Sequence, residues 1–168
     1  MIMRHIAAIL FVMKLATADS LTDGQPFQPE RLAQCLKSPK SANLSVLTDR
    51  NPFYLRGDFD GDGRPDYAVS VRSQDGGTGV LICAGNGEVF LLGGGIGGGK
   101  FSDMPRDRFL APNWAVYSKR EVTALGAFQS NVPHPVPLVK GESIAMIWED
   151  GISLIYWNGK SFKWAGSK

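Results

Sequence analysis

The pattern of apolar and polar positions along this chain is mainly that of short β-strands. Apolar residues alternate with polar ones, between clusters of turn residues, at 53–56, 67–71, 80–83, 88–92, 114–117, 143–148, 152–157 and 161–164. The segment 121–128 fits either a strand or another short element. Asn-Gly or Asp-Gly dipeptides lie between neighbouring strands at 86–87, 150–151 and 158–159, and they favour tight hairpins. The chain is therefore predicted to form antiparallel meanders.

One segment, 29–37, has the period of a helix instead. Leu32, Cys35 and Leu36 follow the i, i+3, i+4 spacing that places them on one face, and the proline at the start suits a first helical turn. The polar stretch 38–51 that follows is predicted to be a loop. Together these elements predict an α+β fold in which one N-terminal helix packs on antiparallel β-meander sheets.

The first 18 residues have the features of a secretory signal peptide. Arg4 and His5 give a positive start, an apolar run follows at 6–15, and Ala-Thr-Ala at 16–18 supplies a cleavage site. No later stretch approaches the roughly 20 apolar residues of a membrane helix, so we expect no membrane span.

Residues 19–168 are accordingly expected to form a single domain that is periplasmic or secreted. The whole chain has 18 Lys and Arg residues and 16 Asp and Glu residues, and removal of Arg4 and Lys14 with the signal peptide leaves 16 of each. Phosphate backbones are bound by clustered positive charge, so this balance argues against a nucleic-acid partner.

Two cysteines, Cys35 and Cys83, lie in the predicted helix and in a predicted strand. An even count in an oxidising compartment suggests a disulfide. Two buried free thiols explain the sequence equally well, and both alternatives stay open. The pair is not a zinc site, because it lacks histidine or further cysteine partners.

The most unusual stretch is 57–71, with the sequence GDFDGDGRPDYAVSV. Its four aspartates fall at positions 1, 3, 5 and 9 of a single loop, and they are Asp58, Asp60, Asp62 and Asp66. Crowded carboxylates repel one another, and a hard divalent cation with six to eight oxygen ligands relieves the repulsion. An oxygen-only set favours Ca²⁺ over Zn²⁺ or Cu²⁺, which prefer histidine or cysteine. The alternative is a solvated acidic turn without an ion.

The surroundings of this loop differ from those of an EF-hand. An EF-hand has a bidentate Glu at position 12 and helices on both sides, whereas position 12 here is Val69 and the flanking segments are predicted strands. Gly63 occupies position 6, where a sharp turn is needed, and Arg64 at position 7 would contribute its backbone carbonyl.

The pattern D-x-D-x-D-G-x-x-D followed by a hydrophobic strand resembles the calcium loop of FG-GAP/VCBS (integrin-type) repeat proteins. The resemblance covers 57–71. It implies Ca²⁺ as the bound ion, and its implied ligands are Asp58, Asp60, Asp62, the carbonyl of Arg64 and Asp66. In the propeller families the motif recurs in blade after blade, whereas this chain has one copy, so a full β-propeller is not expected.

The segment 156–164, with the sequence YWNGKSFKW, resembles the closing hairpin of small secreted bacterial proteins of uncharacterised function. That resemblance implies a compact α+β domain with a single calcium-type loop and no established activity. Trp148, Trp157 and Trp164 either belong to the core or form an exposed aromatic surface for a sugar or peptide.

Two other features suggest chemistry only weakly. The segment 93–101, GGGIGGGKF, approaches a phosphate-binding loop, but Phe101 replaces the Ser or Thr that holds Mg²⁺ and no helix is predicted after it. His134 lies in a proline-rich connector without a predicted nucleophile nearby and is interpreted as a linker residue.

Three functions follow from these observations. The first is a periplasmic or secreted domain with a structural Ca²⁺ in the 58–66 loop. The second is a binding module for an envelope protein, peptide or glycan that uses the aromatic C-terminal hairpin. The third is a metal-dependent hydrolase, for which His134 would have to approach the acidic loop from far along the chain. The first is the leading hypothesis, so we expect a binding protein rather than an enzyme.

Overall fold

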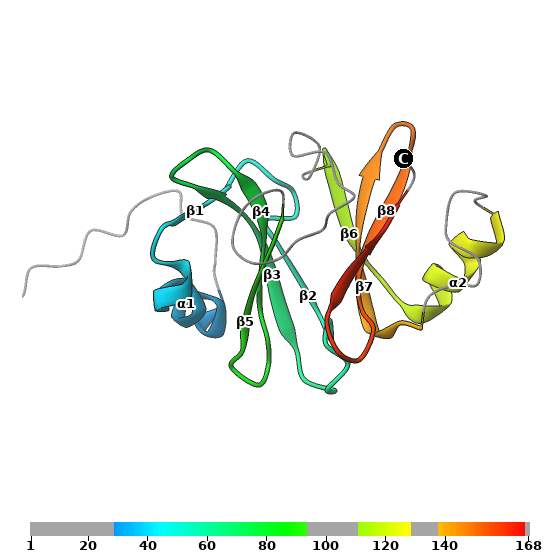
Figure 1. Cartoon of the computed structure of the whole chain (residues 1–168), viewed down its shortest axis with the longest axis horizontal. Coiled ribbons are helices and arrows are strands. Elements are labelled where there is room, and N and C mark those ends of the chain that lie inside the picture. Colours follow the sequence, from blue (N-terminus) through cyan, green and yellow to red (C-terminus); the bar gives the residue numbers. More distant parts are fainter. Residues whose placement is uncertain (1–28, 94–110, 129–137, 167–168) are drawn as a thin grey trace, which may run out of the picture.

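The computed structural model describes residues 29–93, 111–128 and 138–166. Within these ranges the chain forms two antiparallel β-sheets and two α-helices (Figure 1). The helical elements are α1 (Glu30–Leu36), the short 3₁₀ helix η1 (Pro39–Ser41) and α2 (Lys119–Phe128). The strands are β1 (Leu44–Val46), β2 (Tyr54–Gly57), β3 (Asp66–Ser73), β4 (Thr78–Cys83), β5 (Val89–Gly93), β6 (Asn113–Tyr117), β7 (Lys140–Trp148), β8 (Gly151–Trp157) and β9 (Phe162–Ala165).

Several sequence predictions fall on residues outside these ranges. They are the signal peptide at 1–18, most of the glycine-rich segment 93–101, and His134.

The first sheet has five strands and is built around β3. One edge of β3 pairs with two strands in succession: Leu44 to Val46 of β1 lie opposite Ser73 to Val71, and Tyr54 to Gly57 of β2 lie opposite Val69 to Asp66. The other edge pairs with β4, and β4 pairs with β5. The acidic loop is therefore the connection between β2 and β3, and it leaves and returns to the sheet at the facing pair Gly57 and Asp66.

The second sheet has four strands in the order β6-β7-β8-β9. Its pairing is regular except near the start of β7. Lys140 lies opposite Trp157 and Ile144 lies opposite Ile155. The stretch of β7 between these two pairs therefore contains more residues than the facing stretch of β8, which is a β-bulge. Such a bulge turns backbone groups away from the neighbouring strand.

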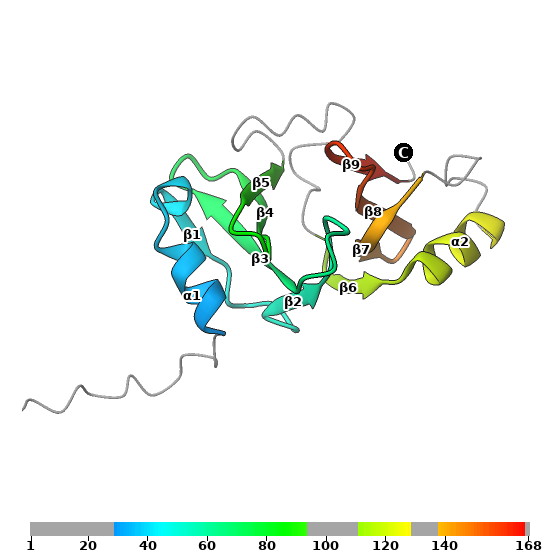
Figure 2. The same cartoon turned by 90° about the horizontal axis from the view of Figure 1, so that it is seen from below.

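The main core lies between the inner faces of the two sheets. The first sheet and the loop contribute Leu55, Phe59, Ala68, Val80, Ile82 and Leu92, and the second sheet contributes Trp114, Ile144, Met146, Ile155 and Phe162. The outer face of each sheet is also apolar, and a helix covers it. Leu32 of α1 packs with Val69, Val71 and Leu81, and Val122 of α2 packs with Ala145 and Leu154. Figures 1 and 2 show α1 and α2 at opposite ends of the molecule, each outside its own sheet.

A disulfide joins α1 to the first sheet. Cys35 of α1 and Cys83 of β4 are bonded with their Cα atoms 5.9 Å apart. The sequence left this bond and two free thiols as alternatives, and the structure has the bond.

Two segments differ from the sequence analysis. The loop predicted at 38–51 contains η1 and β1, because Leu44 to Val46 pair with the far half of β3, a contact that a local pattern does not reveal. The ambiguous segment 121–128 is part of helix α2. Ser118 and Glu121 form a capping box at its start, since the backbone N–H of Ser118 donates to Glu121 Oε2 at 2.7 Å and the backbone N–H of Glu121 donates to Ser118 Oγ at 3.3 Å. The described residues thus form a mainly β structure with two helices, and α1 packs on the sheet as predicted.

Candidate metal centre

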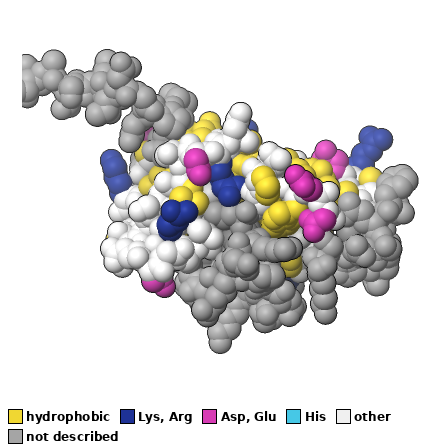
Figure 3. Space-filling view, turned by 90° about the horizontal axis from the view of Figure 1, so that it is seen from above, with side chains coloured by type: hydrophobic (Ala, Val, Ile, Leu, Met, Phe, Trp, Pro, Cys, Tyr) yellow, Lys and Arg dark blue, Asp and Glu magenta, His cyan; other side chains and the backbone are white. Residues whose placement is uncertain are grey.

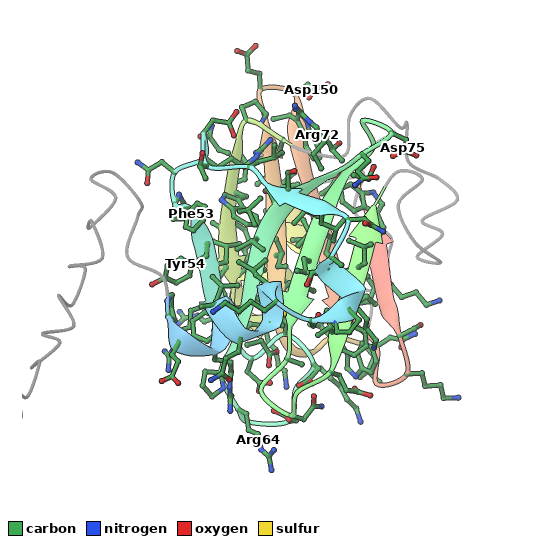
Figure 4. All side chains as sticks on the ribbon, turned by 90° about the vertical axis from the view of Figure 1, so that its left-hand side faces the viewer. Phe53, Tyr54, Arg64, Arg72, Asp75 and Asp150 are labelled. Carbon is green, nitrogen blue, oxygen red and sulfur yellow. A yellow bond between two sulfur atoms is a disulfide. The ribbon has the colours of Figure 1, made fainter. Side chains whose placement is uncertain are left out.

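The acidic loop lies at one end of the strands of the first sheet, where β2 ends at Gly57 and β3 begins at Asp66. Figure 4 shows Arg64 extending from this end, opposite to the end that carries Asp150. Gly61 and Gly63 have positive φ angles of 74° and 84°, which glycine adopts without strain and which turn the loop tightly. The prediction of glycine at the sharp turn is therefore confirmed for Gly63.

Three of the predicted ligands converge. Asp58, Asp60 and Asp66 each present one carboxylate oxygen, and these oxygens lie within 4.8 Å of one another. Asp66 is fully buried, whereas Asp58 and Asp60 are partly exposed. Oxygens at this spacing suit a shared divalent cation with oxygen ligands.

Asp66 is held by backbone N–H groups from two directions. Its Oδ2 accepts hydrogen bonds from Phe59 at 2.6 Å and Asp60 at 3.2 Å, and its Oδ1 accepts one from Gly85 at 2.6 Å. Burial nevertheless raises the pKa of Asp66 to about 6, and the charge of Asp60 adds to the rise, while the three N–H groups act in the opposite direction. A nearby cation would reverse this balance and favour the ionised carboxylate.

The pKa of Asp60 is raised as well. Burial raises its pKa, and the charges of Asp62, Asp58 and Glu88 raise it further, against the lowering effect of the Asp62 N–H. Asp60 Oδ1 accepts that N–H at 3.0 Å, and Oδ2 accepts the side-chain amide of Asn86 at 3.3 Å. The hydrogen bonds therefore orient Asp60 without neutralising it.

Asp58 has a buried oxygen that lacks a hydrogen-bond partner. Its Oδ2 accepts the N–H of Gly63 at 3.2 Å, but Oδ1 is buried and makes no hydrogen bond. A buried acceptor without a partner costs about 1–3 kcal/mol, and more when it is charged. A cation among the three carboxylates would supply that missing partner, so the donor set and this orphaned atom both fit a metal ion.

Asp62 and Arg64 lie further out. Asp62 is exposed and is not one of the three converging carboxylates; its Oδ1 accepts the N–H of Arg64 at 2.7 Å. The side chain of Arg64 points away from the body of the protein (Figure 4), so the ligand prediction concerns its backbone carbonyl alone. For both residues, ligation stays a prediction.

Phe59 anchors the loop in the protein interior. This residue lies between two of the converging aspartates, yet it is only 1% exposed and belongs to the core between the sheets. Its ring and its N–H therefore act together, since the ring fixes the backbone that donates to Asp66. The loop is part of the packed structure and not a surface appendage.

Residues from outside the loop complete the site, and the sequence analysis did not identify them. Gly85 and Asn86 come from the turn between β4 and β5, and Gly141 and Glu142 come from the start of β7. Asn86 was predicted only as a hairpin residue. Glu142 carried no local signal, because its partner Asp58 is far away in the sequence.

No family model, curated protein or solved structure matches this chain. The resemblance to FG-GAP/VCBS calcium loops therefore stays a prediction that rests on the sequence of 57–71 alone. In the described parts of the chain, we find no helix with the length and apolar character needed to cross a bilayer.

Proposed function

We propose that this protein is a periplasmic or secreted calcium-binding domain whose Ca²⁺ is structural and is bound in the loop between β2 and β3. The observation that carries the proposal is the buried, unpartnered Oδ1 of Asp58 beside the converging carboxylates of Asp60 and Asp66. Asp62 and the carbonyl of Arg64 complete the proposed ligand set.

The chemistry of the donors favours Ca²⁺ among common metals. All three converging donors are carboxylate oxygens, and thiolate or imidazole ligands, which Zn²⁺ prefers, are not among them. Mg²⁺ demands nearly ideal octahedral geometry and keeps several waters, whereas Ca²⁺ accepts irregular oxygen sets. The three converging carboxylates come from both ends of the loop and from between them, and they form a charge-rich oxygen set of the kind that Ca²⁺ accepts.

The proposed ion stabilises the fold by binding the native state alone. A ligand adds RT ln(1 + [L]/Kd) to the free energy of unfolding, or about 2.7 kcal/mol at 100 times Kd. Extracellular calcium modules have Kd values of about 10⁻⁴ to 10⁻³ M, which suits a compartment rich in calcium. The disulfide between Cys35 and Cys83 supports an oxidising compartment of this kind.

Thermal unfolding with calcium and with a chelator tests the proposal. We expect saturating calcium to raise the Tm by roughly 5–10 °C over EGTA, with a smaller effect of Mg²⁺. Asp60→Asn should abolish the calcium effect. Asp150→Asn is the matched control, because Asp150 is an exposed aspartate at the opposite end of the molecule (Figure 4). Identical melting of the wild type in calcium and in EGTA would overturn the proposal.

The structure does not favour the two alternative functions. Trp148, Trp157 and Trp164 are partly buried and pack against the core between the sheets. This packing accounts for the three aromatic residues without a glycan or peptide ligand. Both histidines of the chain lie outside the described residues, so no observation favours a metal-dependent hydrolase. Acidic and basic side chains of the described residues both occur on the face shown in Figure 3, and the absence of a nucleic-acid partner stays a prediction from the sequence.

A further inference from the structure

The backbone of Asp58 is held on both sides by one residue of the other sheet. The N–H of Asp58 donates to Glu142 Oε2 at 2.8 Å, and the N–H of Glu142 donates to the carbonyl of Asp58 at 2.6 Å. Asp58 begins the acidic loop of the first sheet, whereas Glu142 lies near the start of β7 in the second sheet. These two hydrogen bonds therefore connect the sheets at the candidate metal centre.

The bulge at the start of β7 makes this connection available. Between Lys140 and Ile144 the pairing with β8 is interrupted, and the pairing with β6 ends at Ser143. Glu142 therefore has a backbone N–H that no neighbouring strand uses, and it bonds to Asp58 instead. Bulges commonly redirect a side chain or backbone group toward a functional site in this way.

Two glycines allow the backbones to approach closely. Gly141 has a φ of 76° and Gly61 has a φ of 74°. A Cβ on Gly141 would lie 2.7 Å from Gly61 N and would also collide with the carbonyl oxygen of Asp58. A Cβ on Gly61 would lie 2.9 Å from Gly141 N. Any side chain at either position would push β7 away from the loop.

We infer that Glu142 is a positioning residue of the proposed calcium site, and that it couples the ion in the first sheet to the attachment of β7 in the second. Glu142 is not among the converging carboxylates, so it acts through Asp58. The N–H and the carbonyl of Asp58 are both held by Glu142, so only the side-chain torsions of Asp58 remain free. In the proposed site these torsions direct the unpartnered Oδ1 toward the ion. The inference rests on the proposed function.

Because coupling is reciprocal, an ion that holds Asp58 in place also strengthens the contact with β7. Loss of the Glu142 carboxylate would leave the Asp58 N–H without its acceptor and free the ligand to move. Loss of an outer-shell partner typically lowers metal affinity by about 10-fold to 100-fold.

Calcium titration calorimetry on the disulfide-bonded protein separates the roles of Glu142. We expect Glu142→Ala to weaken calcium binding by about 10-fold to 100-fold, and Glu142→Gln, which keeps an acceptor oxygen, to restore most of it. Glu149→Ala is the control, because this exposed glutamate lies in the turn beyond the other end of β7 and should leave Kd unchanged. Equal losses in the Ala and Gln variants would overturn the positioning role, since they would indicate that the charge itself matters.

Amide hydrogen exchange of the wild type tests the coupling without a mutation. We expect the N–H of Glu142, in the second sheet, to exchange more slowly in calcium than in EGTA. Unchanged exchange at Glu142 with calcium bound would overturn the inference while leaving the proposed function intact. If the wild type does not bind calcium at all, the proposed function fails and the inference fails with it.

Discussion

Gly85 donates its backbone N–H to Oδ1 of Asp66, and it does so from a hairpin that lies directly against the acidic loop. The approach depends on the missing side chain, because a Cβ at Gly85 would collide with Cβ of Arg64 and lie 3.2 Å from the carbonyl oxygen of Pro65. The turn between β4 and β5 is thus a wall of the candidate metal centre.

Replacement of Gly85 should disturb the metal centre more than replacement of a glycine in the same turn. We expect Gly85→Ala to weaken calcium binding, because the loop or the hairpin must shift and the bond to Asp66 lengthens. Gly87→Ala is the control: its φ of 93° makes alanine unfavourable by about 1–2 kcal/mol, but no atom lies within 4 Å of the added Cβ. Calorimetric titration and urea unfolding of both variants measure the difference. Equal calcium affinities would contradict the prediction.

The raised pKa of Asp66 predicts that calcium and protons compete. A carboxyl whose pKa is about 6 in the fold and 3.8 when unfolded binds a proton in the fold first, so the calcium-free protein loses stability as pH rises from about 4 to about 6. Calcium binds the ionised form, so its affinity should fall by about 10-fold per pH unit below pH 6.

Calorimetric titrations from about pH 5 to about pH 7.5 measure the calcium affinity, and urea unfolding of the metal-free protein from about pH 4 to about pH 7 measures the stability change. A calcium affinity that does not change with pH would contradict it. An NMR titration of the Asp66 carboxyl carbon reports the pKa directly.

Removal of the Phe59 ring should affect stability and calcium binding together. The ring is buried in the core between the sheets, so Phe59→Ala is expected to lower the free energy of unfolding by about 3–5 kcal/mol. The same change loosens the backbone that donates to Asp66, so calcium affinity should fall as well. Phe53→Ala, at a partly exposed ring near the edge of the same sheet (Figure 4), is the control and should do neither to a comparable extent. A stable variant with unchanged affinity would show that the ring does not anchor the loop.

Loss of the disulfide should destabilise the protein mainly through the unfolded state. Cys35 and Cys83 are separated by 48 positions, for which chain entropy predicts about 4 kcal/mol. We expect the double variant Cys35→Ala with Cys83→Ala to unfold at lower urea concentration, and reduction of the wild type with dithiothreitol to have a similar effect. Equal unfolding midpoints for oxidised and reduced protein would argue against a bond in solution.

The sequence was informative where the signals are local. The hairpins at Asn86, Asp150 and Asn158 and the face of α1 follow from nearest neighbours, and the structure contains them. The capping box of Ser118 and Glu121 is also a local signal, and it marks the start of α2.

The contacts that complete the site were beyond a reading of local patterns. The convergence of Asp58 and Asp60 with Asp66 follows from loop spacing, but the contributions of Gly85 and Glu142 depend on how two sheets meet. A glutamate among many charged residues carries no mark of its role until its partner is placed beside it. The three strand residues of β1 were missed for the same reason, because their partner is the far half of β3.

The two hydrogen bonds between Glu142 and Asp58 limit how far this loop can be transplanted. A graft of 57–71 into an unrelated scaffold would carry every aspartate and both turn glycines, yet it would leave behind the clamp from β7 and the wall formed by Gly85. Such a peptide module should bind calcium more weakly than its parent. A graft with the affinity of the parent would also need the start of β7, which contains Glu142, and the turn that contains Gly85.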